Sequence, residues 1–167
     1  MVSKIFILDA NVLIDYAESD LRVLSLAASH LGQVSVASHL LGEVDQIDEQ
    51  DCRDLGIVVV EATMDQVAEA ATGRGSLSFE DRLCLAIARD EGYSCVTNDR
   101  PLRLKCEELN VHVLWGLELM IELVRRKHLS SQAAIATAEG IHARNPQYIT
   151  ANIIGRFRAK VRSLSAK

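Results

Sequence analysis

The chain has 167 residues, of which 49% are hydrophobic and 25% charged, and its formal net charge is −5 at pH 7. This length and composition suit one globular domain with a sizeable core and exclude a disordered or fibrous chain. No apolar run is long enough to span a bilayer, and the apolar start "SKIFILDANVLI" is interrupted by Asp9 with no signal-peptide cleavage site after it. We therefore expect a cytoplasmic protein without a membrane partner.

The cysteines and the charges are distributed in ways that limit the function further. Cys52, Cys84, Cys95 and Cys106 form no C-x-x-C pair and have no nearby His pattern, which predicts free buried thiols rather than a zinc site. Residues 1–119 carry 21 acidic and 9 basic residues, a net charge of −12, whereas residues 120–167 carry 2 and 9, a net charge of +7. Such an acidic segment suits a nucleic-acid-binding protein only if its acids hold metal ions and basic residues face the phosphates.

Short apolar runs alternate with longer helical patterns along the first two thirds of the chain. The runs are continuous, which predicts strands covered on both faces, and helical segments of roughly 10–20 residues between them suit parallel βαβ units. The sequence therefore predicts an α/β sandwich with a parallel sheet. The predicted strands are Ile5–Leu8, Val34–Ala37, Ile57–Val60, Ser94–Thr97 and His112–Trp115.

Only helical patterns follow the fifth strand, so residues 117–167 are predicted to form a helical extension to a core of residues 1–116. The last helix combines an apolar stripe with several basic residues on its other faces. We favour packing of this helix on the core or on a second copy of the chain over direct contact with RNA, and we expect a homodimer. The stripe consists of Ile149, Ile153, Phe157, Val161 and Leu164.

Four acids are predicted to meet at one edge of the sheet. Asp9 follows the first strand, and Asp99 follows the fourth. Asp81 lies in the first turn of the helix "SFEDRLCLAIARDEG", and Glu43 lies early in the helix after the second strand. The carboxyl ends of parallel strands and the amino ends of the following helices share one edge, where ligands bind in such folds.

Each acid also has a purely structural interpretation. Asp9 and Asp99 could be N-caps, Ser78-x-x-Asp81 has the spacing of a capping box, and Glu43 opens an acidic stretch typical of a solvated face. Four carboxylates in one place, however, repel one another and raise a pKa unless a cation lies among them. Hard oxygen ligands of this kind suit Mg²⁺ or Mn²⁺.

The segments "KIFILDANVLID", "LLGEV", "LSFEDRLCLAIARDEGY" and "CVTNDRPLR" together resemble the PIN-domain ribonucleases, and in particular the VapC-type toxins of prokaryotic toxin–antitoxin pairs. The resemblance spans about Ser3–Trp115 and implies a PIN-like three-layer α/β/α sandwich with a five-stranded parallel sheet in the order 3-2-1-4-5. It assigns the acidic site to Asp9, Glu43, Asp81 and Asp99. Positions that help to order this site match Asn11, Thr97 and Asn98.

The resemblance and the acids together lead to the hypothesis of a metal-dependent endoribonuclease. Asp9, Asp81 and Asp99 would hold one or two Mg²⁺ or Mn²⁺, and Glu43 would complete the shell or orient the attacking water. The substrate would be tRNA or another structured RNA. Possible phosphate contacts come from Arg82, Arg100 and Arg103.

Several alternatives to this hypothesis stay open. The chain could be a catalytically silent PIN-like binding or assembly module, or an RNA-processing nuclease outside toxin–antitoxin systems. Many VapC-type toxins end soon after the fifth strand, so this extension would cover the core, enlarge a dimer interface or replace part of an antitoxin-binding surface. A phosphoacceptor receiver domain fits poorly, because Glu61 and Gly116 stand where it needs Asp and Lys.

Overall fold

Within residues 4–166, which the computed structural model describes, five parallel strands form a single sheet in the order β3-β2-β1-β4-β5. Every neighbouring pair is parallel. The predicted class, strand order and all five predicted strands are confirmed, with ends that differ by one residue at most. The strands are β1 (Ile5–Leu8), β2 (Gln33–Ala37), β3 (Val58–Val60), β4 (Ser94–Val96) and β5 (Val113–Leu114).

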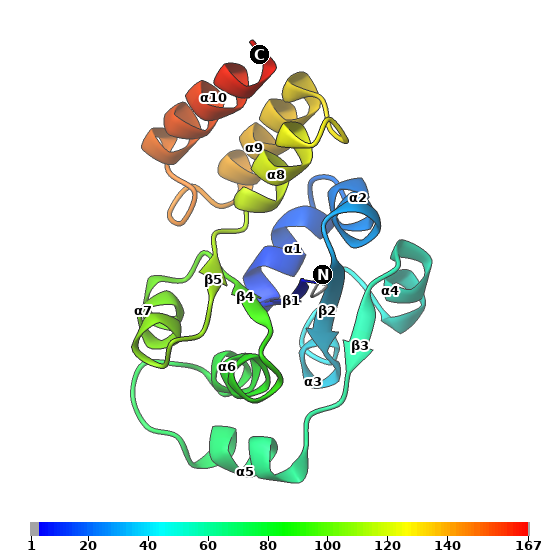
Figure 1. Ribbon diagram of the computed structural model, residues 1–167. Helices are drawn as coiled ribbons and strands as arrows, with labels where there is room; N and C mark the ends of the chain where they lie inside the picture. Colours follow the sequence, from blue (N-terminus) through cyan, green and yellow to red (C-terminus); the bar gives the residue numbers. More distant parts are fainter. Residues whose placement is uncertain (1–3, 167) are drawn as a thin grey trace.

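Helices cover both faces of the sheet. Right-handed crossovers that run from β1 outward to β3, and then back through β4 to β5, put their helices on opposite faces. Figure 1 shows this division, with α1 and α2 on one side of the sheet and α5 and α6 on the other. The first group is α1 (Ala10–Ala17), α2 (Arg22–His30) and α4 (Glu49–Leu55), and the second is α5 (Met64–Thr72), α6 (Phe79–Glu91) and α7 (Arg100–Glu108). The one-turn helix α3 (Ser38–Leu41) follows β2, and its His39 packs on Phe79 of α6.

The chain after β5 forms three further helices, α8 (Glu118–Arg125), α9 (Ser131–Arg144) and α10 (Ala151–Ser165). Helix α8 packs on α2, α9 packs on α1, and α10 packs on both α8 and α9. They lie at the end of the molecule opposite α5 (Figure 1). Met120 and Phe157 belong to the same hydrophobic core as Ile7 and Val96, so the extension and the sheet share buried apolar surface.

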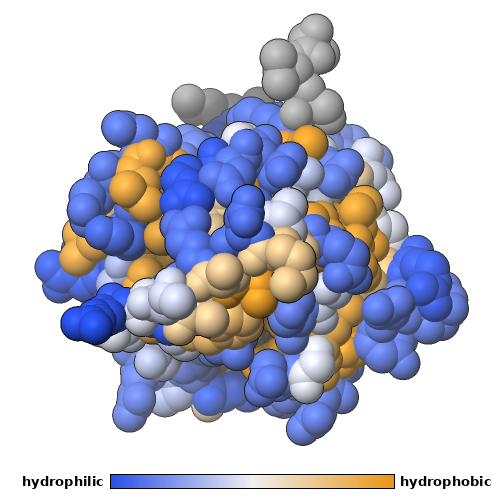
Figure 2. All heavy atoms as spheres, turned by 90° about the horizontal axis from the view of Figure 1, so that it is seen from below, coloured by the Kyte–Doolittle hydropathy of each residue, from blue (hydrophilic) through white to orange (hydrophobic). Residues whose placement is uncertain are grey.

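The surface contrasts with this core. Seen from the side of α5, it is mostly hydrophilic, with apolar patches separated by polar side chains (Figure 2). All four cysteines are free and buried, as predicted. Among residues 4–166, no helix combines the length and the apolar character that crossing a membrane requires.

The start of β2 provides a test of the sheet geometry. Gly32 has a φ of +154°, and a Cβ added there would overlap the Lys4 carbonyl oxygen, which accepts the Gln33 N–H at 3.0 Å. We predict that Gly32→Ala lowers the free energy of unfolding by about 2 kcal/mol or more.

Gly155, inside α10, has open space around it. Gly155→Ala should instead raise the free energy of unfolding by about 0.5–1 kcal/mol. Urea unfolding of both variants measures this, and equal shifts would contradict the assigned backbone.

Candidate functional site

The site begins where β1 and β4 end side by side. Their register pairs Leu8 with Val96, and the next residue, Asp9, donates its N–H to the Val96 carbonyl at 3.1 Å. Asp9 therefore lies level with Thr97, and Asp99 follows two residues later. The side chains that leave these two strand ends meet at the carboxyl edge of the sheet, as predicted.

The Thr97 hydroxyl connects the two acids. It donates a short hydrogen bond to Oδ2 of Asp9 and accepts one from the Asp99 backbone N–H at 3.0 Å. Oδ1 of Asp9 accepts the Val12 N–H at 2.9 Å. Asp9 and Thr97 are both buried. The Asp9 carboxylate is thus held from both sides, by the Thr97 hydroxyl and by the Val12 N–H.

All three aspartates also cap helices. Asp9 caps α1, and Oδ2 of Asp99 accepts the Leu102 N–H at 3.1 Å at the start of α7. Asp81 forms a capping box with Ser78 at the start of α6, in which its Oδ2 accepts the Ser78 N–H at 3.3 Å. The predicted caps are real, but they do not separate the acids. Capping fixes each carboxylate at the edge where the helices begin.

The three carboxylates influence one another electrostatically. Burial is the main cause that raises the pKa of Asp9 to about 7, against the lowering effect of the hydrogen bonds from Thr97 and Val12. The charges of Asp81 and Asp99 raise the pKa of Asp9 further. Burial also raises the pKa of Asp81, and Asp99 adds to that increase. Holding these acids ionised together therefore costs free energy that a cation would offset.

The donor set fits a hard divalent cation. It consists of carboxylates, and hydrogen bonds within residues 4–166 engage only Oδ2 of Asp81 and of Asp99, which leaves Oδ1 of each without a donor. In the same part of the chain, no three His, Cys, Asp or Glu side chains lie close enough to ligate one ion directly. The donor chemistry therefore fits Mg²⁺ or Mn²⁺, but the three side chains do not converge on one ion as they stand in this structure.

Glu43 lies elsewhere than predicted. Helix α3 ends at Leu41 after one turn, so Glu43 lies in the turn beyond the helix rather than early in it. The side chain is exposed and makes no hydrogen bond or ion pair with the other residues that the structure describes. Helix α3 stops at Leu41 with Gly42 as its C-cap, and within the described residues no hydrogen bond or ion pair holds the Glu43 side chain against the three aspartates.

The two predicted supporting asparagines differ from each other. Asn11 is exposed, and its side chain has no hydrogen bond within the described part of the chain. Asn98 is buried, accepts the Gly116 N–H at 2.8 Å and donates to Oδ2 of Asp15 at 3.4 Å. Asn98 thus fixes the backbone just before Asp99, and its side chain makes no hydrogen bond with Asp9, Asp81 or Asp99.

The three candidate arginines also have different roles. Arg82 is half-buried, and its guanidinium donates to the carbonyls of Ala70 and Leu77, so it holds the loop before α6. Arg103 lies over the Trp115 ring, with its Cζ 3.7 Å from the ring centroid. Arg100, next to Asp99, is exposed. Arg82 therefore serves the fold, whereas Arg100 is exposed beside Asp99 and Arg103 packs on Trp115.

With this geometry in place, the chain can be compared with known proteins. A solved structure of a PilT N-terminus domain protein from the hyperthermophilic archaeon Sulfolobus solfataricus aligns with a TM-score of 0.53 and 13% identity. The alignment covers 71% of this chain and 92% of that protein. The chain has a PIN-like fold. No protein-family model matches the sequence, and no curated protein matches it.

A buried polar network beside the PIN-like site was missed from the sequence. Asp15 accepts hydrogen bonds from Asn98 and, at 3.2 Å, from Nδ2 of Asn145, and burial raises its pKa to about 6. The Tyr16 hydroxyl donates to the Gly116 carbonyl at 2.7 Å. An acid beside a tyrosine inside the apolar helix "NVLIDYA" was the available signal. Its partner lies 130 residues away, which hid the contact.

The raised pKa of Asp9 predicts a specific pH dependence of stability without metal. Asp9 keeps its proton up to about pH 7 when folded but loses it near pH 4 when unfolded, so the folded state binds more protons within this window. The free energy of unfolding must fall as the pH rises through it. In EDTA, the stability of Asp9→Asn relative to wild type should rise by up to about 4 kcal/mol from pH 4 to pH 8.

Urea unfolding at the two pH values measures this difference. The exposed Asp45 provides the control, because Asp45→Asn should change stability equally at both pH values. A pH-independent effect of Asp9→Asn would show that the buried carboxylate is not protonated as inferred.

Proposed function

We propose that the chain is a metal-dependent endoribonuclease that hydrolyses RNA phosphodiester bonds with Mg²⁺ or Mn²⁺. The supporting observation is that Asp9, Asp81 and Asp99 reach one sheet edge from three separate elements, where burial and then the charges of Asp81 and Asp99 raise the pKa of Asp9. A PIN-like fold, which is common among nucleases, adds to this support.

Asp9, Asp81 and Asp99 would hold the metal, in part through water. A bound divalent ion would lower the pKa of the attacking water and offset charge on the phosphate. With a pKa of about 7, Asp9 is partly protonated near neutral pH without metal. Metal binding would displace this proton, so the affinity for the metal should increase as the pH rises. Thr97 and Val12 prevent the Asp9 carboxylate from turning away. Glu43 is exposed near the end of α3 and would act only after moving toward the aspartates.

The substrate surface would lie beside these acids. Arg100 is exposed one residue after Asp99. Arg103 follows one helical turn later, and its backbone N–H donates a hydrogen bond to the Asp99 carbonyl at 3.0 Å. Cations at such positions contact phosphates and give affinity without sequence choice. The net +7 of residues 120–167 supplies further positive charge.

The proposal predicts metal-dependent cleavage that requires Asp99. Asparagine caps helices about as well as aspartate, so Asp99→Asn should fold normally while losing one metal ligand. We expect wild type to cleave a pool of tRNA and structured RNA in Mn²⁺ or Mg²⁺ and not in EDTA. Asp99→Asn should be slower by about 100-fold or more. The matched control is Asp65→Asn, which changes an exposed acid in the first turn of α5 and should cleave like wild type.

Two results would contradict the nuclease. One is cleavage that persists equally in EDTA or in Asp99→Asn, which would indicate a contaminant or another site. The other is an absence of cleavage together with no rise in the melting temperature of wild type over Asp99→Asn in Mn²⁺. In that case the acids are helix caps, and the chain is a PIN-like binding module.

We also propose, from the sequence resemblance, that the nuclease acts as the toxin of a toxin–antitoxin pair, with an antitoxin and a second copy of the chain as partners. Induced expression of wild type should then arrest bacterial growth, and expression of Asp99→Asn should not. Plating efficiency after induction measures this. Normal growth of cells that contain active nuclease would favour an RNA-processing enzyme instead.

A further inference from the structure

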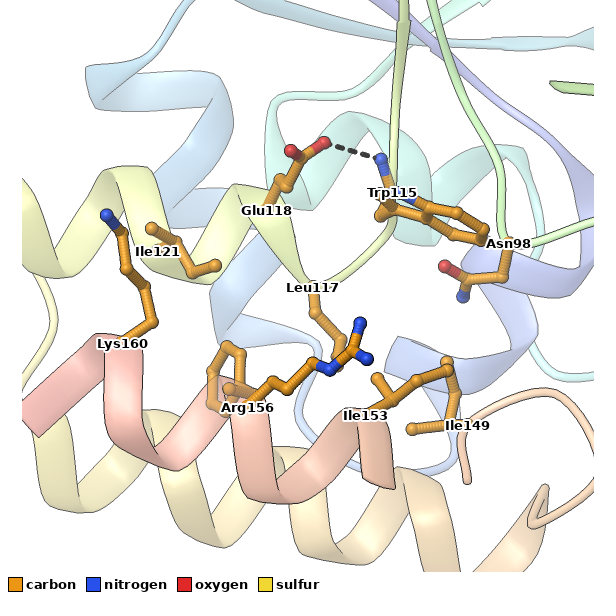
Figure 3. A pocket seen from close by; sticks show the side chains of 10 residues that line it. Asn98, Trp115, Leu117, Glu118, Ile121, Ile149, Ile153, Arg156 and Lys160 are labelled. Carbon is orange, nitrogen blue, oxygen red and sulfur yellow. Dashed lines mark hydrogen bonds between the residues drawn. The ribbon is translucent and has the colours of Figure 1, made fainter. Parts of the chain in front are cut away.

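A mostly apolar pocket of about 330 Å³ opens between α10 and the segment that joins β5 to α8 (Figure 3). Most of its wall is aliphatic or aromatic. Figure 3 shows the side chains of α10 directed toward this space from one side, and Trp115 and Asn98 bounding it on the other. The lining residues are Asn98, Trp115, Leu117, Glu118, Ile121, Ile149, Ile153, Arg156, Phe157 and Lys160.

The pocket lies on the same edge of the sheet as the acids. Strands β1, β4 and β5 are consecutive neighbours, and their carboxyl ends lead into Asp9, Asn98 and Trp115 respectively. Asn98 lines the pocket, and the next residue is Asp99. Hydrogen bonds to Gly116 and Asp15 hold the Asn98 amide. The Asn98 side chain, which belongs to the pocket lining, is therefore held in place one residue before Asp99.

The chemistry of the pocket suits a flat ring that carries negative charge beside it. The Trp115 side chain is 39% exposed, and Arg103 covers one face of its ring. Arg156 and Lys160 are exposed on α10 at the pocket. Glu118 is the only acid in the lining, and its Oε2 accepts a hydrogen bond from the backbone N–H of Trp115 at 2.7 Å. The positive charge at the pocket therefore exceeds the negative charge.

Arg103 is itself incompletely satisfied. Its Nη1 is buried and has no hydrogen-bond partner in the described part of the chain. Burial lowers the pKa of Arg103, which marks the guanidinium as poorly solvated. Arg103 does not line the pocket, and its contribution there is the support that it gives to one face of the Trp115 ring.

We propose that this pocket binds the base of an unpaired nucleotide of the RNA, next to the phosphodiester that the aspartates act on. The inference rests on the proposed function, because it concerns the same substrate. The volume lies at the small end of ligand pockets, and base stacking on an aromatic ring is a common source of affinity for single-stranded RNA. Arg156 and Lys160 would contact the flanking phosphates. An apolar peptide helix is the rival occupant, but a cationic border favours a polyanion.

Trp115 makes this inference directly testable, because it is the only tryptophan in the chain and its fluorescence reports on the pocket. The probe is a single-stranded RNA hexamer, compared with hexamers in which one base at a time is replaced by an abasic residue. The protein is the Asp99→Asn variant in Mg²⁺, so that cleavage does not consume the RNA. We expect the intact hexamer to quench Trp115, and one abasic position to weaken binding about tenfold and abolish the quench.

Two variants of α10 provide matched controls. Arg156→Gln removes a cation that lines the pocket and should weaken hexamer binding about fivefold. Arg162→Gln removes an exposed cation of the same helix that does not line the pocket, and binding should stay within about twofold. Equal loss in both variants would mean that α10 attracts RNA only through its net charge and would overturn the pocket assignment.

Other outcomes separate this inference from the nuclease. If all abasic hexamers bind as tightly as the intact hexamer and quench Trp115 fluorescence equally, the base pocket is overturned. The same holds if an apolar helical peptide quenches Trp115 fluorescence and RNA does not. Cleavage by wild type without a base-dependent quench would leave the nuclease intact and remove only the pocket. A base-dependent quench without cleavage would support the pocket and count against the nuclease.

Discussion

The adjacency of β1 and β4 in a parallel sheet is the constraint on which the site depends. It places Asp9 level with Thr97, so that one hydroxyl can donate to the Asp9 carboxylate and accept the Asp99 N–H. Side chains alternate between the two faces of a strand, so a shift of one residue in this register would turn Thr97 away from Asp9. The chemistry at the edge is therefore tied to the packing of the sheet, because the same apolar residues that fix the register also fix the distance between the acids.

The extension is joined to this edge by polar contacts as well as by apolar packing. Asn145 at the end of α9 donates to Asp15, which also accepts from Asn98, and Asn98 accepts the Gly116 N–H. Asn98 directly precedes Asp99, so the helices after β5 help to hold the backbone that carries a site residue. Buried polar groups of this kind are costly unless all are satisfied, which favours one arrangement of the extension over others. The C-terminal helices are thus joined to the core by polar contacts that reach the residue before Asp99.

The sheet and the three aspartates could be predicted because both depend on local sequence. Continuous apolar runs mark buried strands, and an acid directly after such a run both caps the next helix and lies at the sheet edge. Glu43 was misplaced because its helix stops after one turn at Gly42. Arg82 was predicted to contact phosphate, but its guanidinium donates to the carbonyls of Ala70 in α5 and Leu77 in the loop before α6, and the sequence does not reveal this packing. Asp15 was missed for a similar reason, since its partner Asn145 lies in another helix.

The capping role of the three aspartates has an evolutionary consequence. Asparagine or serine would serve these N-terminal positions about as well, and a single base change converts an aspartate codon to an asparagine codon. At the buried position of Asp9, a neutral side chain would even be favoured by selection for folding alone, since burial disfavours the charged form. A lineage under no pressure beyond folding would thus drift away from acids at these positions.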